Sequence, residues 1–402
     1  MRSDPNGTQD LRAIQRLCSL GTGARAATLG PVSDFRREPF RLLFPLGALL
    51  ALAGVAPWLL FGTGLSRLYL GVFHAFTMTQ AFLLAIAAGF LGTMIPRRTA
   101  AAPLSGLELV MLCASLAAIP TALISDRVAL AEVAYLVAIG TLAEFALRRL
   151  RRSGKRIPPS FVLIPFAFVA GVAGASLLLA ATFGAPAWTI AVGRGLVEQG
   201  VLVPLVMALA PMLTPIMLDG EAAPDARHKW PQLALGALFA ASFAAEASWP
   251  RAAQALRGAL AAIEIFVVAG VARRPRVPGL HRRVYQVAMA LVPVGLLAAA
   301  ARPAYRVPML HLTFVGGLSL LVFAVGAHVT FLHTGHDALA RRRPWPIAVV
   351  AALTLAATIV RACAEHVAAH FVQMLGLAAM LWLTAAALWA VYLGPMMLRR
   401  KS

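Results

Sequence analysis

The chain has 402 residues, of which 60% are hydrophobic and only 13% are charged. Soluble globular domains have a charged share of about a quarter, so this composition excludes an ordinary soluble domain and indicates a membrane protein. A helical span needs about 20 mainly apolar residues. The strands of a β-barrel would instead alternate over segments of about ten residues, and the sequence lacks that alternation.

The formal net charge of +20 is distributed like that of a membrane protein. All but eight of the 36 lysines and arginines lie in the N-terminal stretch, at the C-terminal end or in alternate loops. This positive-inside bias predicts that both termini lie in the cytoplasm. A nucleic-acid groove would not alternate loop by loop, so membrane lipid is the expected partner and nucleic acid is not. The eight exceptions are Arg67, Arg127, Arg194, Arg251, Arg257, Arg302, Arg306 and Arg361.

Residues 1–38 are basic and lack the apolar run of a secretory signal, so they are expected to form a flexible cytoplasmic tail. Residues 39–402 are expected to form a single transmembrane domain, because long apolar runs follow one another between prolines, glycines and charges. The predicted fold class is an all-α bundle of about twelve spans, and an even number agrees with basic segments at both ends. The expected spans are 41–61, 72–95, 104–124, 128–147, 161–183, 189–214, 231–248, 252–271, 284–301, 308–333, 346–363 and 370–397.

Histidines mark three of these spans on the outer side. The second, tenth and twelfth spans run from outside to inside, which places His74, His311 and His370 near the outer surface. Imidazoles from separate helices can ligate haem iron inside a bundle. Arg302, Arg306 and Arg361 are expected at the same face, where they would neutralise haem propionates. The simpler interpretation, a histidine that only hydrogen-bonds to a carbonyl or to water, stays open for each one.

Two further candidate metal ligands, His328 and His333, are expected in the inner half of the membrane. His328 lies 17 residues beyond His311, or about 25 Å along a helix, so one metal centre cannot include both. His333 is expected either to hold a second metal site or to stabilise the cytoplasmic end. His74 and Met78 share one helix face, and a histidine with a thioether suits copper.

Carboxylates within the expected spans support a different class of function. Ionised groups in lipid are costly and tend to be functional, and Glu132, Glu198 and Glu264 all lie within spans. In the proline-rich sixth span, Arg194 precedes Glu198 and Gln199, and proline frees backbone carbonyls inside a bundle. A proton path fits this segment, and so does a structural Arg–Glu pair. The alternative function is therefore a cofactor-free secondary transporter that uses intramembrane carboxylates.

Short motifs stand in a characteristic order along most of the chain. They are Glu38-Pro39-Phe40-Arg41, Pro57-Trp58, Gly89-Phe90-Leu91, Pro103-Leu104-Ser105-Gly106, Gly193-Arg194, Gln199-Gly200, His311-Leu312, Gly316-Gly317 and His333-Thr334-Gly335. Together they resemble the NnrS family, haem- and copper-containing membrane proteins associated with bacterial responses to nitric oxide. The chain looks like a divergent member of that family.

The resemblance implies a protein of the bacterial inner membrane with histidine-ligated haem, of the b type, and it carries over to His74, His311 and His333. The implied function is response to, or detoxification of, nitric oxide, which is then the expected ligand. Whether the protein is an enzyme stays open, and so does contact with respiratory complexes as an assembly factor. Family members usually read His-x-His-Glu-Met at the second span, whereas this chain has His74-Ala75-Phe76-Thr77-Met78. That departure counts against copper.

Overall fold

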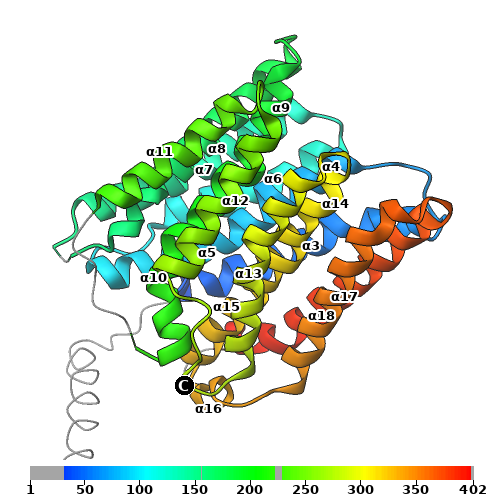
Figure 1. The fold of residues 1–402 in the computed structure, drawn as a ribbon. Coiled ribbons are helices and arrows are strands. Elements are labelled where there is room, and N and C mark those ends of the chain that lie inside the picture. Colours follow the sequence, from blue (N-terminus) through cyan, green and yellow to red (C-terminus); the bar gives the residue numbers. More distant parts are fainter. Residues whose placement is uncertain (1–30, 155, 222–228, 400–402) are drawn as a thin grey trace, which may run out of the picture.

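The computed structural model describes residues 31–154, 156–221 and 229–399. These residues form helices and connecting turns without any β-strand, which confirms the predicted all-α class. Figure 1 shows the helices packed side by side as one bundle. Residues 1–30 of the expected tail lie outside the described residues, and α2 (Pro31–Arg37) precedes the first long helix.

Ten helices within the described part of the chain are long and apolar enough to cross a membrane. The protein is therefore a multi-pass membrane protein by the length and composition of its helices. The ten helices are α3 (Phe40–Gly62); α4 (Gly71–Phe76) with η1 (Thr77–Phe82) and α5 (Leu83–Thr99); α6 (Gly106–Ile124); α7 (Val128–Arg151); η2 (Pro159–Val162) with α8 (Leu163–Thr182); α9 (Trp188–Gly195) with η3 (Leu196–Val201) and α10 (Leu202–Asp219); α13 (Leu280–Ala301); η5 (Pro303–Tyr305) with α14 (Arg306–His311), η6 (Leu312–Ser319) and α15 (Leu320–His333); α17 (Trp345–Cys363) with η7 (Ala364–His366); and η8 (Ala368–His370) with α18 (Phe371–Leu398).

The other two expected spans are helical as well. The segment 231–248 corresponds to α11 (Trp230–Ala245), whose 16 residues reach about 24 Å at ~1.5 Å per residue, less than a ~30 Å hydrocarbon core. The segment 252–271 corresponds to α12 (Pro250–Ala262) and η4 (Ile263–Val268), which bury Arg257 and Glu264. The number of twelve spans therefore stays a prediction.

The start of the first span and the end of the last lie at the same end of the bundle. Arg41 Nη1 donates hydrogen bonds to the carbonyl oxygens of Met397 and Arg399, over 3.0 and 2.9 Å. This arrangement requires an even number of crossings between them. It agrees with the predicted topology, although the cytoplasmic location of this end stays a prediction.

Local sequence signals set several helix boundaries. At the start of α6, Ser105 Oγ accepts a hydrogen bond from Glu108 N (3.1 Å), while Ser105 N donates to Glu108 Oε2 (2.6 Å). This capping box satisfies two backbone donors that a helix start leaves free. The same carboxylate holds Arg149 Nη1 at 3.0 Å and so joins α6 to α7.

Candidate functional site

Three long helices, the second, sixth and tenth of the expected spans, are each interrupted by a π-helical segment near one end. These segments are η1 in Gly71–Thr99, η3 in Trp188–Asp219 and η6 in Pro303–His333. A further π-helical segment, η4, ends the shorter helix that begins at Pro250. π-Helical turns are rare and occur often at functional sites. The three interruptions therefore identify the part of the bundle in which to look for a site.

These three helices line one cavity of about 460 Å³. That volume is within the range of about 300–1,000 Å³ that is typical of small-molecule sites. Most of the lining is apolar, from α3, α17 and α18 as well as from the three interrupted helices. Its polar and sulfur-containing side chains are His74, Met78, Thr79, Arg194, Glu198, His311, Ser319, Arg361 and Glu365, with Tyr69, Trp58 and Trp382.

His74 and His311 both reach this cavity, and each is anchored through the same ring nitrogen. His74 Nδ1 lies 2.9 Å from the carbonyl oxygen of Gly54, and His311 Nδ1 lies 2.8 Å from that of Val307. A carbonyl oxygen only accepts, so Nδ1 carries the proton in both rings and Nε2 keeps its lone pair. Neither Nε2 has a hydrogen-bond partner among the described residues, and this is the tautomer and orientation of a metal-ligating imidazole.

The anchor of His74 depends on the absence of a side chain at Gly54. A Cβ atom at this position would lie 3.0 Å from Met78 Sδ and 3.0 Å from Thr77 Cγ2. The glycine therefore lets α3 approach η1 closely enough for its carbonyl oxygen to reach the imidazole. On another side, the indole of Trp58 meets the ring of His74 edge to face, with centroids 5.7 Å apart.

Two guanidinium groups complete the polar part of the lining. Arg194 donates from Nε and Nη2 to Glu198 Oε1, at 3.1 Å each, one turn along the same helix. Arg361 Nη2 lies 3.7 Å from Glu365 Oε1, while its Nη1 is buried with no hydrogen-bond partner. Because an unpaired buried donor is costly, Arg361 is incompletely satisfied by the protein and suits an anionic ligand.

The comparison with family models decides the family. The model described as NnrS protein matches residues 34–401, which is nearly the whole chain. The chain belongs to the NnrS family. No curated protein matches it.

The cavity of this NnrS-family protein fits a haem. It offers two imidazoles from separate helices, each with a free Nε2, and a guanidinium with an unsatisfied nitrogen that suits a propionate. The residues fit a copper ion less well. The described residues contain no cluster of three or more His, Cys, Asp or Glu side chains placed to hold a metal ion. Met78 adds a thioether to the lining, but it does not replace the missing ligands.

The other expected outer residues lie outside the cavity lining. His370 and Arg302 are exposed. Arg306 Nη2 donates to Glu246 Oε1 over 2.8 Å, and the same carboxylate binds the buried Arg257 at 2.7 Å. Arg306 is therefore already neutralised by a carboxylate, and the structure brings neither Arg302 nor Arg306 to the two histidines.

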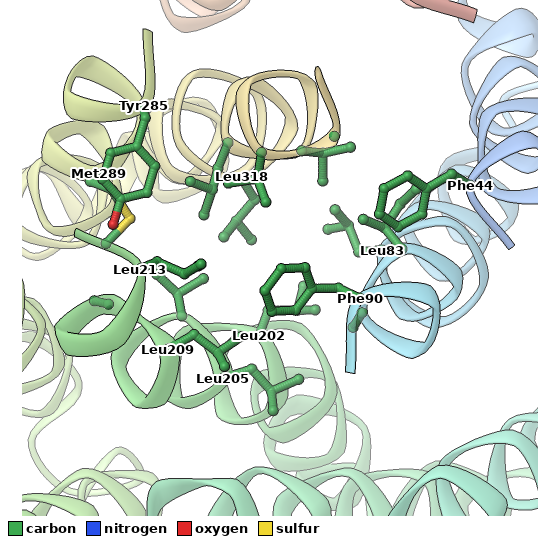
Figure 2. A pocket seen from close by; sticks show the side chains of 18 residues that line it. Phe44, Leu83, Phe90, Leu202, Leu205, Leu209, Leu213, Tyr285, Met289 and Leu318 are labelled. Atoms are coloured by element: carbon green, nitrogen blue, oxygen red, sulfur yellow. The ribbon is translucent and has the colours of Figure 1, made fainter. Parts of the chain in front are cut away.

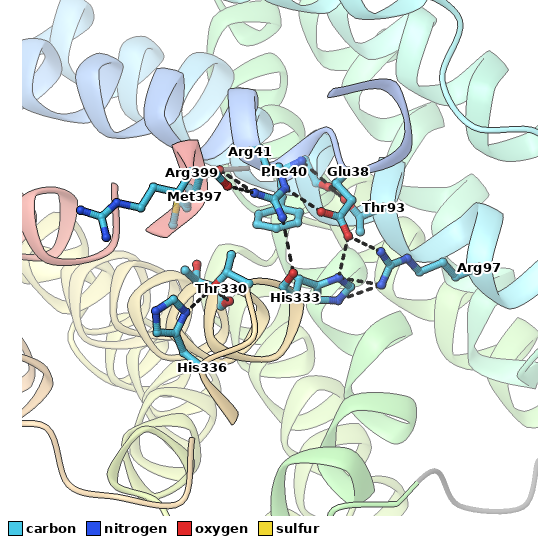
Figure 3. Close-up of polar contacts among 12 residues, drawn as sticks. Glu38, Phe40, Arg41, Thr93, Arg97, Thr330, His333, His336, Met397 and Arg399 are labelled. Carbon is cyan, nitrogen blue, oxygen red and sulfur yellow. Dashed lines mark hydrogen bonds and ion pairs between the residues drawn. The ribbon is translucent and has the colours of Figure 1, made fainter. Parts of the chain in front are cut away.

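His333, in the family-like motif His333-Thr334-Gly335, lies at the opposite end of the tenth span. Figure 3 shows it between Glu38 and Arg97. Its Nδ1 lies 3.4 Å from Glu38 Oε1 and 2.6 Å from Arg97 Nη1, and Glu38 Oε2 accepts from Arg41 Nε over 2.6 Å. Burial on its own raises the pKa of Glu38, but the contacts with His333 and Arg41 outweigh it and lower the pKa to about 2. The cluster ties three helices together at the end of the bundle that holds both described chain ends.

His328 forms a second histidine pair that the sequence did not reveal. Its Nδ1 lies 3.1 Å from Nε2 of His281 on α13, and both side chains are buried. The pair shares no lining residue with the cavity of His74 and His311. Since 47 residues separate the partners, only the packing of α13 on α15 could show that they meet.

The intramembrane carboxylates are distributed over separate places. Glu198 lines the cavity, and Gln199 is buried beside Gln254, with Gln254 Nε2 donating to Gln199 Oε1 over 3.2 Å. Glu132 accepts from Gln80 Nε2 over 2.9 Å, and Glu264 accepts from Gln232 Nε2 over 3.0 Å. Both lie outside the cavity lining, so these carboxylates do not share the cavity with Glu198, and the transporter alternative is not favoured.

Proposed function

We propose that this NnrS-family protein is a haem protein of the bacterial inner membrane that acts in the response to nitric oxide. His74 and His311 would hold the iron through their free Nε2 atoms, and Arg361, whose Nη1 has no partner in the protein, would pair with a propionate. The haem is of the b type, held without a covalent bond to the chain. The observation that carries the proposal is the presence of both imidazoles, with matching backbone anchors, in one cavity.

The residues around the histidines have distinct tasks in this proposal. The carbonyl oxygens of Gly54 and Val307 fix the orientation of the two rings. The apolar lining, with Phe314 and Trp382 among it, excludes water and so strengthens the interactions of charged groups in the cavity. When bound, haem would supply an iron that exchanges an electron with nitric oxide or binds it in place of one of the two imidazoles.

An optical spectrum tests this proposal directly. The full chain, expressed with sufficient haem and purified in detergent, is expected to show a Soret band and a pyridine haemochrome of b type. His74→Ala and His311→Ala are each expected to remove or shift the band while the thermal melting of the protein persists. His370→Ala is the matched control, because this exposed histidine lies outside the lining. A wild-type protein without a Soret band, or unchanged bands in both variants, would refute the proposal.

A further inference from the structure

A second and smaller pocket, of about 110 Å³, lies next to the histidine cavity. Figure 2 shows that apolar side chains from several helices face one another around it, among them Phe90, Leu209 and Leu318. The lining comes mainly from α5, α10, α13 and α15, with Leu318 from η6 and Phe44 from α3. Three of these helices are the continuations of the interrupted spans that carry His74, Arg194 and His311.

The pocket offers nothing to bind water. Its lining contains one polar side-chain group, the hydroxyl of Tyr285, which is paired with Thr214 Oγ1 at 2.8 Å. A buried water needs two to four polar partners, and this lining offers only one hydroxyl, which is already paired. The occupant of this space is therefore apolar.

The pocket and the cavity are contiguous. Leu83 lines both of them. Along the sixth span, Glu198 lines the cavity and Leu202, one turn further, lines the pocket; along the tenth, Val315 lines the cavity and Leu318 the pocket. Each of the interrupted helices thus lines the cavity from its π-helical end and the apolar pocket along its continuation, with the two linings meeting at Leu83 and at Leu318 and Ser319.

We propose that this pocket is a docking site for small uncharged gas molecules, of which nitric oxide is one, and that they pass from it to the histidine cavity. This inference rests on the proposed function, in which haem in the histidine cavity reacts with nitric oxide. An apolar cavity of ~150 Å³ takes up xenon or benzene, so about 110 Å³ is enough for a diatomic gas. Nitric oxide is uncharged and dissolves readily in apolar surroundings, so it needs no polar route through the bilayer.

Xenon tests the pocket independently of any haem. The full chain in lipid nanodiscs is titrated with xenon, and binding is followed by ¹²⁹Xe nuclear magnetic resonance. We expect one saturable site in the wild type and in His74→Ala. Ala87→Phe and Val206→Phe fill the pocket and should abolish it, whereas Ala352→Phe, on an exposed face of α17, should retain it. Leu209→Ala enlarges the pocket and should strengthen xenon binding, which keeps the test open if a filling variant fails to fold.

Nitric oxide kinetics then test the passage to the histidines. In haem-containing protein, Ala87→Phe and Val206→Phe should slow the association of nitric oxide about tenfold or more without changing the Soret band, and Ala352→Phe should leave it unchanged. A wild type without a saturable xenon site, or a lipid acyl chain resolved in the pocket and undisplaced by xenon, would overturn the docking site. Unchanged association rates in both filling variants would overturn the passage. Xenon binding in a protein without a Soret band would instead refute the proposed function and leave the pocket as a gas site.

Discussion

Gly62 of α3 and Gly376 of α18 meet backbone to backbone. A Cβ atom on Gly62 would overlap Cα of Gly376, and one on Gly376 would lie 2.8 Å from Cα of Gly62. Small residues allow such close approach of helices in membranes, where dispersion and interhelical contacts drive association. The first and last long helices of the chain are therefore joined at a point where no side chain fits.

Gly62→Ala and Gly376→Ala are each expected to destabilise the protein. Because the added methyl group meets backbone atoms, which move only with their helices, the cost should be about 1–3 kcal/mol or more. Thermal melting in detergent measures the change. The matched control is Gly140→Ala in α7, where a Cβ atom meets nothing within 4 Å; there alanine should stabilise the helix by about 0.5–1 kcal/mol. Equal melting of all three variants would contradict the close contact.

The His281–His328 pair predicts a specific pattern of coupling. His281→Leu leaves Nδ1 of His328 without its buried partner, and His328→Leu does the same to Nε2 of His281. Each single variant should therefore lose about 1–3 kcal/mol of stability, the penalty of an unsatisfied buried polar group. The double variant removes both groups and should lose less than the sum of the two single losses.

A double-mutant cycle, followed by thermal or denaturant unfolding, measures this coupling. The exposed His370 serves as the reference, and His370→Leu should leave the stability unchanged. Strict additivity of the two buried substitutions would show that the imidazoles do not interact.

The Glu38 cluster predicts a dependence of stability on pH. The pKa of Glu38 is lowered from the ordinary value of 4.5 to about 2 in the folded chain. The charged carboxylate therefore stabilises the fold above pH 4.5. That contribution is lost as the pH falls from 4.5 through about 2, because the unfolded chain takes up the proton first and below about pH 2 the carboxyl is protonated in both states. Glu38→Gln should melt at a lower temperature than the wild type at neutral pH, and the difference should vanish toward pH 2.

The control for this experiment is Glu144→Gln. Glu144 pairs with Arg148 on one helix, and the two side chains are 53% and 46% exposed. Such an exposed pair contributes little, so this variant should follow the wild type at every pH. A constant difference between Glu38→Gln and the wild type down to pH 2 would mean that the carboxylate is not held in its charged form.

Substitution of Arg361 should weaken haem binding while the two proposed iron ligands stay in place. If its guanidinium pairs with a propionate, Arg361→Gln removes a charge-assisted hydrogen bond of about 1.5–3 kcal/mol, which corresponds to roughly ten- to a hundredfold weaker haem binding. Haem transfer to apomyoglobin, followed at the Soret maximum, measures this. Arg302→Gln is the control, since Arg302 is exposed and outside the lining. A larger loss of haem affinity in Arg302→Gln than in Arg361→Gln would show that the propionates do not bind in this cavity.

The sequence predicted the helices well, because long apolar runs have few alternatives in a membrane. It also predicted that His74 and His311 lie at the same depth, since depth follows from the position along a span. It could not show which arginine accompanies them. Arg306 is as near to His311 in the sequence as Arg361 is to His366, yet Glu246 of another helix holds Arg306 while Arg361 lines the cavity.

Residue spacing alone does not show which side chains meet when the contact depends on the lateral packing of the helices. For Arg194 and Glu198 the sequence left both a proton path and a structural pair open. The structure pairs the two side chains at 3.1 Å and places both in the lining of the histidine cavity. His281 and His328 belong to neighbouring helices whose facing sides follow only from the folded bundle. The assignment of His74, His311 and the other proposed ligands stays a prediction until the spectra are measured.

The π-helical segments have a consequence for the phase of their helices. A π turn takes up one residue more than an α turn, so the apolar half of each interrupted span is rotated relative to the half that carries the histidine or arginine. In the second span, this offset lets one continuous helix line the cavity with His74 and both the cavity and the pocket with Leu83. Removing a single residue from Thr77–Phe82 would restore uniform α-helical winding and rotate Phe90 away from the apolar pocket while His74 stayed in place. A one-residue deletion would therefore change the rotation of one lining relative to the other, whereas a substitution changes only the lining in which it stands.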